Sequence, residues 1–314
     1  MDYEEALMAK AVWYYYFENL TQQQISDRLG VSRIRVMRLL EKARETGMIR
    51  FSLRRGHESR LSAEKRLMER YGLDDVFLVP GPAEPAETNA NIAKAASMYI
   101  HERLRENSVI NIGYGDTPGR ILNNLATIAE NTITCVSLTG GVSHYLPNTL
   151  SNVFNAKLHL IPAPLLASSR EMAEAIRQEE SVQEISRMIS HAELSVVGIG
   201  SMDTHATIFH SGILNNNDLL YLSMKGAKGD ILSHFFDSEG RPVSSSIEDR
   251  LIATSLDKLR SLSHVIGVAA GRIKAEAIRS ALRGHLLDIL ITDTDTAETI
   301  LAMDEAESSP PDSQ

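Results

Sequence analysis

Seven short apolar runs alternate with amphipathic stretches between residues 75 and 302, and this order constrains the fold more than any other feature. The apolar runs cover 75–79, 108–112, 132–138, 157–161, 193–199, 264–269 and 288–291. The stretches with helical periodicity cover 89–106, 118–130, 170–191, 248–260, 273–282 and 295–302. Strands that alternate with helices form a parallel sheet with helices on both faces. We therefore expect a doubly wound α/β domain over residues 73–304.

Length and cysteine content exclude several other classes of protein. A chain of 314 residues is long enough for about two domains, each with its own core. Its apolar runs are far shorter than the roughly 20 residues of a membrane span, and its first residues are acidic where a secretory signal is basic. The single cysteine, Cys135, excludes an internal disulfide and lies in an apolar run, where we expect it to be buried. We therefore expect a cytoplasmic protein without a membrane partner.

The sequence shows no pattern that would hold a metal or build a common catalytic centre. Its ten histidines include no His-x-x-x-His pair, and it contains no Gly-x-Ser-x-Gly elbow. The glycines at 113–119 have neither the spacing of a dinucleotide-binding fingerprint nor that of a P-loop. We assign no metal, no cofactor and no catalytic residue.

Basic residues are concentrated near the N-terminus of an otherwise acidic chain. The formal net charge is −9, yet residues 1–55 contain ten Lys or Arg against seven Asp or Glu. Within that segment, residues 28–55 hold nine basic residues and two acidic ones. A small positive domain on an acidic protein is the electrostatic pattern expected for contact with a polyanion such as DNA.

Residues 1–55 have the order of elements of a winged helix-turn-helix domain. A helix over 3–19 comes first, and a capping box of Thr21 and Gln24 starts a second helix. After a glycine turn, Ser32 caps a third helix, and an alternating segment that follows is expected to form the wing at 48–53. Three helices and a strand in this order predict the fold.

The periodicity of the first helix predicts which of its aromatic side chains face the core. At about 100° per residue, one face combines four side chains, which are Trp13, Tyr16, Phe17 and Leu20. Tyr14 and Tyr15 fall on the other side. There they suit either a half-exposed surface or dimer contact, or a contact with a phosphate.

The third helix presents arginines where a recognition helix contacts base edges. Its inward positions follow the spacing i, i+3, i+4, i+7 and are Val36, Leu39, Leu40 and Ala43. The outward positions near its N-terminal half are Arg33, Ile34, Arg35, Met37 and Arg38. Arginines suit guanine edges and phosphates, and apolar side chains suit thymine methyls. Together with Thr21, Gln22 and Ser32, they form the set that we predict to bind double-stranded operator DNA.

Alternatives remain open for two residues of this set. Arg38 also has the spacing to pair with Glu41 on a solvated face, and Ile34 also suits packing against a neighbouring helix.

Two further segments complete the domain division. Residues 56–72 are predicted to form a linking helix, and residues 305–314 are predicted to form a disordered tail.

Glycine turns directly follow two of the predicted strands. In a parallel sheet, ligands bind beyond the carboxyl ends of the strands. The first turn contains Gly113, Gly115 and Thr117 and opens a helix, whose N-terminus favours an anion. The second turn consists of Thr139, Gly140 and Gly141. Together the turns suit a phosphate, although such glycines are equally typical of a tight backbone path.

Two charged residues lie in further glycine-rich turns. Asp230, in the turn 225–232, suits hydrogen bonds from sugar hydroxyls or, alternatively, caps the segment that follows. Lys274 follows the apolar run 264–269 and suits a phosphate or a sugar oxygen, with a solvated lysine as the alternative.

Several of these segments resemble one known family. Residues 20–30 and 38–43 are similar to the DNA-binding domain of SorC/DeoR-type sugar-responsive transcriptional regulators. The likeness continues in sequence order through 138–142, 161–164, 197–200, 225–232 and 275–278. Within the family, 161–165 and 229–232 look most like repressors of autoinducer-2 uptake operons. Tyr114 and Ala270 depart from the family pattern, which often has Trp and Gly at these positions.

The resemblance implies the fold of the larger domain and its ligand contacts. It implies a domain similar in fold to sugar-phosphate isomerases and deaminases that binds phosphorylated sugars without converting them. The implied effector contacts are Gly113, Gly115, Thr117, Thr139, Gly140, Gly141, Asp230, Leu232 and Lys274. We assign no role to His144 and Tyr145.

The sequence as a whole predicts a transcriptional repressor that a phosphorylated small sugar, such as phospho-autoinducer-2, releases from its operator. Helix-turn-helix modules act as symmetric pairs, so we expect a homo-oligomer, either a dimer or a tetramer. The alternatives are a sugar-phosphate isomerase or deaminase and an activator of the same architecture. An enzyme would need a positioned base with a proton-transfer partner, and it would have no use for the basic segment 28–55.

Overall fold

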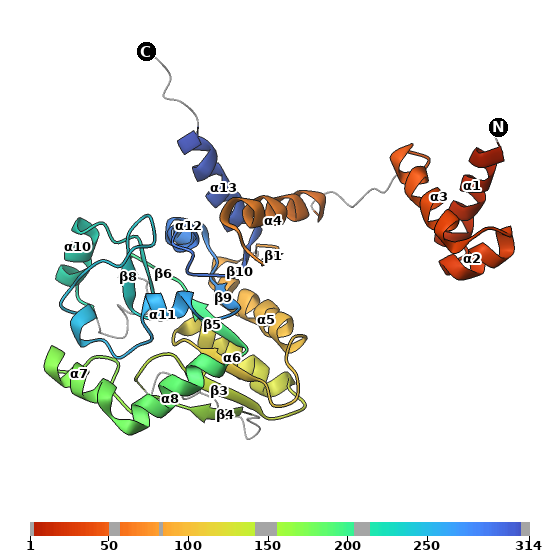
Figure 1. Cartoon of the computed structure of the whole chain (residues 1–314). Helices are drawn as coiled ribbons and strands as arrows, with labels where there is room; N and C mark the ends of the chain where they lie inside the picture. Colours follow the sequence, from red (N-terminus) through yellow and green to blue (C-terminus); the bar gives the residue numbers. More distant parts are fainter. Residues whose placement is uncertain (1–2, 50–56, 82–83, 142–155, 204–213, 309–314) are drawn as a thin grey trace, which may run out of the picture. The chain divides into compact units, whose positions relative to one another are not determined.

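The computed structural model describes residues 3–49, 57–81, 84–141, 156–203 and 214–308. The chain divides into two compact units, an N-terminal unit, Met1–Glu58, and a C-terminal unit, Ser59–Gln314 (Figure 1). Each unit has a hydrophobic core of its own. Among the described residues, no helix is both long enough and apolar enough to cross a membrane.

The N-terminal unit consists of three helices, α1 (Tyr3–Tyr16), α2 (Gln22–Leu29) and α3 (Arg33–Glu45). Both predicted caps are confirmed. The Thr21 hydroxyl accepts from the amide of Gln24 at 3.3 Å, and Gln24 Oε1 accepts from the Thr21 amide at 2.9 Å. The Ser32 hydroxyl accepts from the amide of Arg35 at 3.3 Å. The two helices of the helix-turn-helix therefore begin where the sequence predicts.

The core of the N-terminal unit confirms the inward face of α3 and corrects that of α1. Its buried side chains are Leu7, Met8, Ala11, Ile25, Val36, Leu39, Leu40 and Ala43. Trp13 and Phe17 were expected inside, but they are 54% and 67% exposed and stack on each other, with ring centroids 4.6 Å apart. The face set by Leu7 and Ala11 passes, at about 100° per residue, through Tyr14 rather than Trp13. Tyr14 accordingly packs against this core, and Arg28 lies over its ring.

The predicted wing strand is only partly described. Met48 and Ile49 form a bend rather than a strand, and residues 50–53 lie outside the described residues.

All seven apolar runs form strands of one parallel sheet in the C-terminal unit. The strands are β1 (Asp75–Val79), β2 (Val109–Ile112), β3 (Ile133–Ser137), β4 (Ala156–His159), β5 (Leu194–Gly198), β9 (Val265–Val268) and β10 (Ile289–Asp293). Their order in the sheet is β1-β10-β9-β5-β2-β3-β4, and every neighbouring pair is parallel. From β2 the chain builds outward to β4 and then returns to place β5 on the other side of β2. The strand order therefore reverses between β2 and β5, where such sheets bind ligands.

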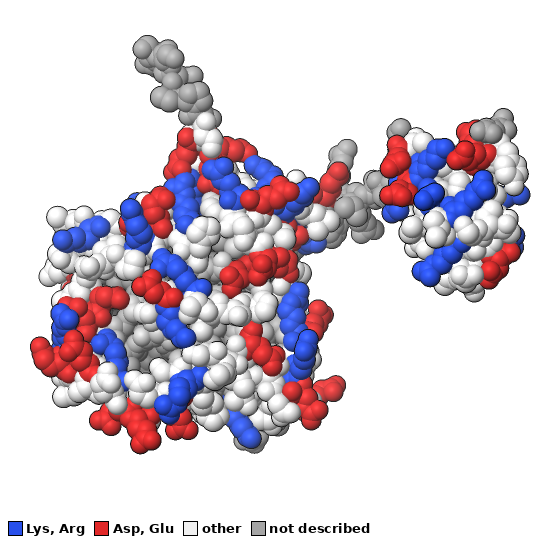
Figure 2. Space-filling model, viewed as in Figure 1, with Lys and Arg blue, Asp and Glu red and all other residues white. Residues whose placement is uncertain are grey.

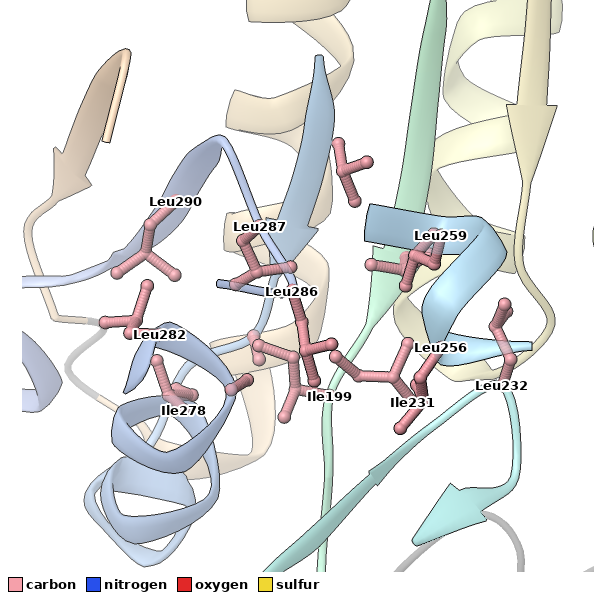
Figure 3. Close-up of a cluster of buried hydrophobic side chains, with 14 of the residues drawn as sticks. Ile199, Ile231, Leu232, Leu256, Leu259, Ile278, Leu282, Leu286, Leu287 and Leu290 are labelled. Atoms are coloured by element: carbon pink, nitrogen blue, oxygen red, sulfur yellow. The ribbon is translucent and has the colours of Figure 1, made fainter. Parts of the chain in front are cut away.

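Helices cover both faces of the sheet, as the sequence predicts. One face packs against α5 (Thr88–His101) and α6 (Asp116–Ile128) and contains the buried Cys135, the pKa of whose thiol is raised to about 12 by burial. The other face packs against α8 (Glu180–His191), α12 (Ala275–Arg283) and α13 (Thr294–Ser308). Figure 3 shows part of this second core, where Ile231 and Leu232 lie near leucines of α11 (Leu256–Arg260).

Several predicted elements differ in extent. The stretch 170–191 divides into α7 (Arg170–Gln178) and α8, and 248–260 contains only the turn η3 (Glu248–Arg250) and α11. α13 continues to Ser308, so the start of the predicted tail is helical, and residues 309–314 lie outside the described residues. α4 (His57–Tyr71), expected as a linker, contributes Leu67 and Tyr71 to the core of the C-terminal unit.

One subdomain has no counterpart in the sequence prediction. Three short strands, β6 (Gly200–Ser201), β7 (Gly229–Ile231) and β8 (His234–Phe236), form a separate antiparallel sheet beside the large one. α10 (Asn216–Met224) lies in the segment between β6 and β7 and packs with Phe235 in a small core. This small sheet supplies one wall of the site described next.

Candidate effector site and nucleic-acid surface

A cavity of about 720 Å³ lies at the carboxyl edge of the sheet, at the point where the strand order reverses. Its walls come from the segments that follow β1, β2, β5 and β9 and from the β7–β8 hairpin. Five of the predicted effector residues line it, and they are Gly115, Thr117, Asp230, Leu232 and Lys274. The rule that ligands bind beyond strand ends therefore locates most of the cavity.

The wall that follows β2 is the first turn of α6. Gly115 caps this helix with a φ of +128°, a conformation that a side chain would strain, and Thr117 is 5% exposed. The free amides of a helix's first turn and its dipole favour an anion. Asp116, in the same turn, has its carboxylate held by Arg120 at 2.9 Å and by Asn89 at 2.8 Å. Its negative charge is thus partly neutralised next to the proposed anion position.

Asp230 lies in strand β7, so the sequence-based prediction that it lies in a turn is wrong. It pairs with Gly200 of β6, where a Cβ would overlap Asp230 Oδ1, so the glycine makes room for the carboxylate. Its side chain is buried, and burial raises its pKa to about 6 despite the Ser233 amide and the positive field of Lys274. The carboxylate is therefore poorly solvated for its charge, which suits it to accept hydrogen bonds from ligand hydroxyls.

Lys274 ends the short turn η4 (Arg272–Lys274) and caps α12. Burial lowers the pKa of its ammonium, and this effect is opposed by Asp230, Asp203 and Asp116. The side chain is only partly exposed and lines the cavity, which favours a ligand contact over the solvated alternative. An ammonium in the electrostatic field of these carboxylates stays charged more readily and can donate to a phosphate or a sugar oxygen.

Gly113 and the turn Thr139–Gly141 lie outside the cavity lining. A Cβ on Gly113 would come within 2.9 Å of Leu232 Cδ2, so this glycine acts through the packing of Leu232. The amides of Gly140 and Gly141 donate to the carbonyls of Ile252 and Ala163, each at 2.8 Å. A Cβ on Gly140 would overlap the Pro164 carbonyl. The second glycine turn therefore follows a tight backbone path, and its amides are already used.

The cavity also contains residues that the sequence analysis did not assign. Gly198 ends β5, Gly200 and Ser201 form β6 directly after it, and Asp203 accepts a hydrogen bond from Ser201. The sequence signal for these residues was available, because Gly198 lies near the end of the apolar run 193–199 and the other three residues follow that run. Thr88 and Asn89, at the start of α5, also line the cavity, but they do not directly follow an apolar run and had no such signal. His144 and Tyr145 lie outside the described residues.

The predicted recognition face of α3 is exposed. Arg33, Arg35 and Arg38 lie on the surface, together with Ile34 at 61% and Met37 at 48% exposure. This exposure argues against Ile34 packing on a neighbouring helix. Among the described residues, no ion pair joins Arg38 to Glu41, although their spacing of three residues on one helix would permit it.

Two other basic residues of the N-terminal unit form ion pairs within it. Arg28 forms an ion pair with Glu18 at 2.7 Å, and Lys42 forms one with Glu4 at 3.0 Å. In Figure 2, basic side chains cross the visible face of this unit, whereas basic and acidic side chains are interspersed over the larger one.

The residues that begin α2 and α3 border a groove of about 730 Å³. Thr21, Gln22 and Arg33 line it together with Tyr15 and Tyr16. Ser32 is exposed at the start of α3. The groove thus combines the exposed guanidinium group of Arg33 with hydroxyl and amide donors, the groups that contact phosphates in protein–DNA complexes.

The fold and the two surfaces define a regulator that combines a helix-turn-helix with a sugar-binding domain. Residues 56–302 match the family model of the sugar-binding domain, and residues 9–46 match the model of sigma-70 region 4. The chain belongs to this family of sugar-binding transcriptional regulators.

Individual relatives narrow the class. The chain is 36% identical over 304 residues to the transcriptional regulator LsrR of Klebsiella pneumoniae, covering 96% of this chain and 94% of the relative. It is 36% identical to LsrR of Escherichia coli K12 over 302 residues, covering 95% of each. Because these relatives are transcriptional regulators, the chain is a regulator and not an enzyme.

Solved structures agree with this assignment. The full-length sorbitol operon regulator SorC of Klebsiella pneumoniae matches with a TM-score of 0.67 at 25% identity, covering 94% of this chain and 98% of that one. A DeoR family transcriptional regulator from Listeria monocytogenes matches with a TM-score of 0.69 at 25% identity, covering 76% and 98%. The expected SorC/DeoR-type architecture is confirmed.

Proposed function

We propose that this chain is a transcriptional repressor that binds operator DNA and leaves it when a phosphorylated small sugar occupies the cavity of the C-terminal unit. One observation carries this proposal. A single cavity combines the N-terminus of α6 with a buried carboxylate, Asp230, and a partly buried ammonium, Lys274. An anion site beside a hydroxyl acceptor is the chemistry that a sugar phosphate needs.

The proposed ligand pose assigns one role to each wall. The phosphate lies at the first turn of α6, near Gly115 and Thr117. Asp230 accepts from ring or chain hydroxyls, Lys274 donates to a phosphate or sugar oxygen, and Leu232 packs against the carbon skeleton. Thr139, Gly140 and Gly141 keep a supporting role, since the turn they form lies outside the cavity lining.

Within the class of sugar phosphates, we propose phospho-autoinducer-2 as the effector. The support is the LsrR likeness over nearly the whole chain, which includes the segments 161–165 and 229–232. A repressor of this kind works in the cytoplasm, where its operator lies.

On the DNA side, Arg33, Arg35 and Arg38 contact bases and phosphates, with Ile34 and Met37 against thymine methyls. Thr21, Gln22 and Ser32 contribute phosphate contacts at the ends of the helices. One such module offers a small contact area, so the chain acts as a homo-oligomer, a dimer or tetramer, on a near-palindromic site. A monomer in sedimentation, both free and on DNA, would contradict this assembly.

The decisive experiment measures release from DNA. Fluorescence anisotropy with DNA from the chain's own promoter should show a 5- to 150-fold weaker complex, roughly, once phospho-autoinducer-2 is added. Autoinducer-2 itself should release poorly, because the α6 turn then lacks its anion. D230A and K274A should bind DNA normally but resist release. K225A, a lysine outside the cavity, is the matched control and should behave as wild type.

Three results would each contradict part of the proposal. Equal release by the phosphorylated and unphosphorylated sugars, or full release of both cavity variants, would place the effector elsewhere. Deleting the gene should raise transcription from the same promoter, and a fall would make the chain an activator.

A further inference from the structure

The hairpin that carries Asp230 and Leu232 into the cavity has an unusual turn. β7 and β8 are joined by Leu232 and Ser233, and both residues have positive φ values, +55° and +68°. A two-residue hairpin turn of this kind normally uses Gly, Asn or Asp, because other side chains crowd the backbone there. Contacts from outside the hairpin must therefore hold Leu232 and Ser233 in place.

The segment that follows β2 supplies those contacts. The Tyr114 hydroxyl is hydrogen-bonded to the Ser233 hydroxyl at 2.5 Å, and Ser233 is completely buried. The neighbouring Gly113 leaves the space that Leu232 Cδ2 fills. Within the hairpin, the Ser233 amide donates to Asp230 Oδ2 at 3.2 Å. The Tyr114 hydroxyl thus holds the turn in place, and the Ser233 amide of that turn orients the Asp230 carboxylate.

The Tyr114–Ser233 hydrogen bond joins two walls of one cavity. Tyr114 belongs to the loop that leads into α6, whereas Asp230 and Leu232 belong to the hairpin, and all three line the cavity. The first wall is the proposed position of the phosphate and the second that of the sugar. The hydrogen bond therefore fixes the spacing between the anion position and the hydroxyl acceptor.

We propose that Tyr114 is a positioning residue for effector selectivity, whose hydroxyl holds the Leu232–Ser233 turn so that Asp230 and Leu232 meet the sugar part of the ligand. This inference rests on the proposed function of the cavity. The first turn of α6 needs no help from the hairpin to attract an anion. Removal of the hydroxyl should therefore weaken recognition of the sugar while recognition of the phosphate persists.

Isothermal titration calorimetry on the full chain tests this with phospho-autoinducer-2 and with inorganic phosphate. Y114F should bind phospho-autoinducer-2 about 3- to 10-fold more weakly, the range of one lost buried hydrogen bond, and inorganic phosphate within twofold of wild type. S233A should show the same loss, and the double variant should be no worse than either single one. The matched control is Y99F. The hydroxyl of the buried Tyr99 also donates to another side chain, Asp75, at a distance of 2.5 Å, but neither residue lines the cavity.

The outcomes separate this inference from the proposed function. Equal weakening of both ligands, or no weakening of either, would overturn the role of Tyr114. If the wild type binds no sugar phosphate, the proposed function fails, and hydrogen exchange of the segment 229–236 then decides about the hydrogen bond. Faster exchange of the Ser233 amide in Y114F than in Y99F would support the role of Tyr114 in holding the turn, and unchanged exchange would overturn it.

Discussion

The Tyr71 hydroxyl donates to Asp304 Oδ2 at 2.7 Å and thereby ties α4 to the C-terminal helix α13. Oδ1 of the same carboxylate accepts from Arg279 Nε of α12 at 2.7 Å, and all three side chains are buried. α4 is the helix that follows the N-terminal unit in the chain, and α12 begins directly after Lys274. One buried carboxylate thus connects the helix that leads from the DNA-binding helices with the helix that starts at the effector cavity.

Loss of this carboxylate should destabilise the C-terminal unit strongly. D304A leaves Arg279 buried with half of its ion pairs and Tyr71 without an acceptor, so the free energy of unfolding should fall by about 3 kcal/mol. Urea denaturation measures the change. The neighbouring E305A removes an exposed ion pair with Arg66 and should cost less than about 1 kcal/mol. Equal losses for the two variants would show that burial of the Asp304 cluster carries no special weight.

The large sheet was predictable mainly because its central strands are buried on both faces. When both faces are buried, a strand such as Val265–Val268 contains no polar side chain, and such an apolar run can be recognised without knowing which strands lie beside it. The small sheet left no such signal. Its strands have two or three residues, and Gly229–Ile231 contains a glycine and a charged aspartate, so neither length nor alternation marks it as a strand.

The same contrast applies to the site. Gly115, Thr117 and Lys274 follow apolar runs, so the strand-end rule finds them. Asp230 is recognisable as a charged residue among glycines, but its position opposite Gly200 depends on a strand pairing between segments far apart in sequence. The wrong prediction for Trp13 has a different cause. Residues 11–17 are all apolar or aromatic, so the sequence allows two apolar faces at the end of α1. The packing of Leu7 and Ala11 in the core determines which of the two faces is buried.

The three arginines of α3 should each contribute to DNA binding. R33A, R35A and R38A should each weaken operator binding by about 1–3 kcal/mol, because their exposed guanidinium groups are available to bases or phosphates. A base contact, when lost, relaxes sequence specificity, whereas a lost phosphate contact weakens all sequences and reduces the salt slope by about 1. Salt-controlled titrations distinguish the two.

K42A is the control for these variants, since Lys42 lies on the same helix and is paired with Glu4. It should bind operator DNA nearly as wild type does. If all three arginine variants also do so, α3 is not the recognition helix.

Asp230 should make the stability of the C-terminal unit depend on pH in an unusual direction. Its pKa is about 6 in the folded chain and 3.8 ordinarily, so the folded state holds this proton more tightly than the unfolded state does. The charged form is thus costly to bury, and the cost grows as pH rises from about 4 to about 6. D230N removes it and should stabilise the chain above pH 6 by about 3 kcal/mol, a gain that fades toward pH 4.

Thermal unfolding across this pH range checks the sign. The exposed D257N should show no such pH-dependent gain. A gain for D230N that instead grows on acidification would mean that the carboxylate is stabilised, and not penalised, in the cavity.

Two glycine substitutions should separate a glycine that the site requires from one that it does not. G200A places a methyl group where Asp230 Oδ1 lies, so the carboxylate must turn away or the strands β6 and β7 must separate. We expect a loss of effector affinity of about tenfold or more and a loss of stability of about 1–3 kcal/mol, with operator binding in the absence of effector unchanged. G119A, on α6, meets no atom within 4 Å and should gain about 0.5–1 kcal/mol from helix propensity, with effector affinity within twofold of wild type. Calorimetry and thermal unfolding measure both variants, and full effector affinity in G200A would mean that the ligand does not depend on the position of Asp230.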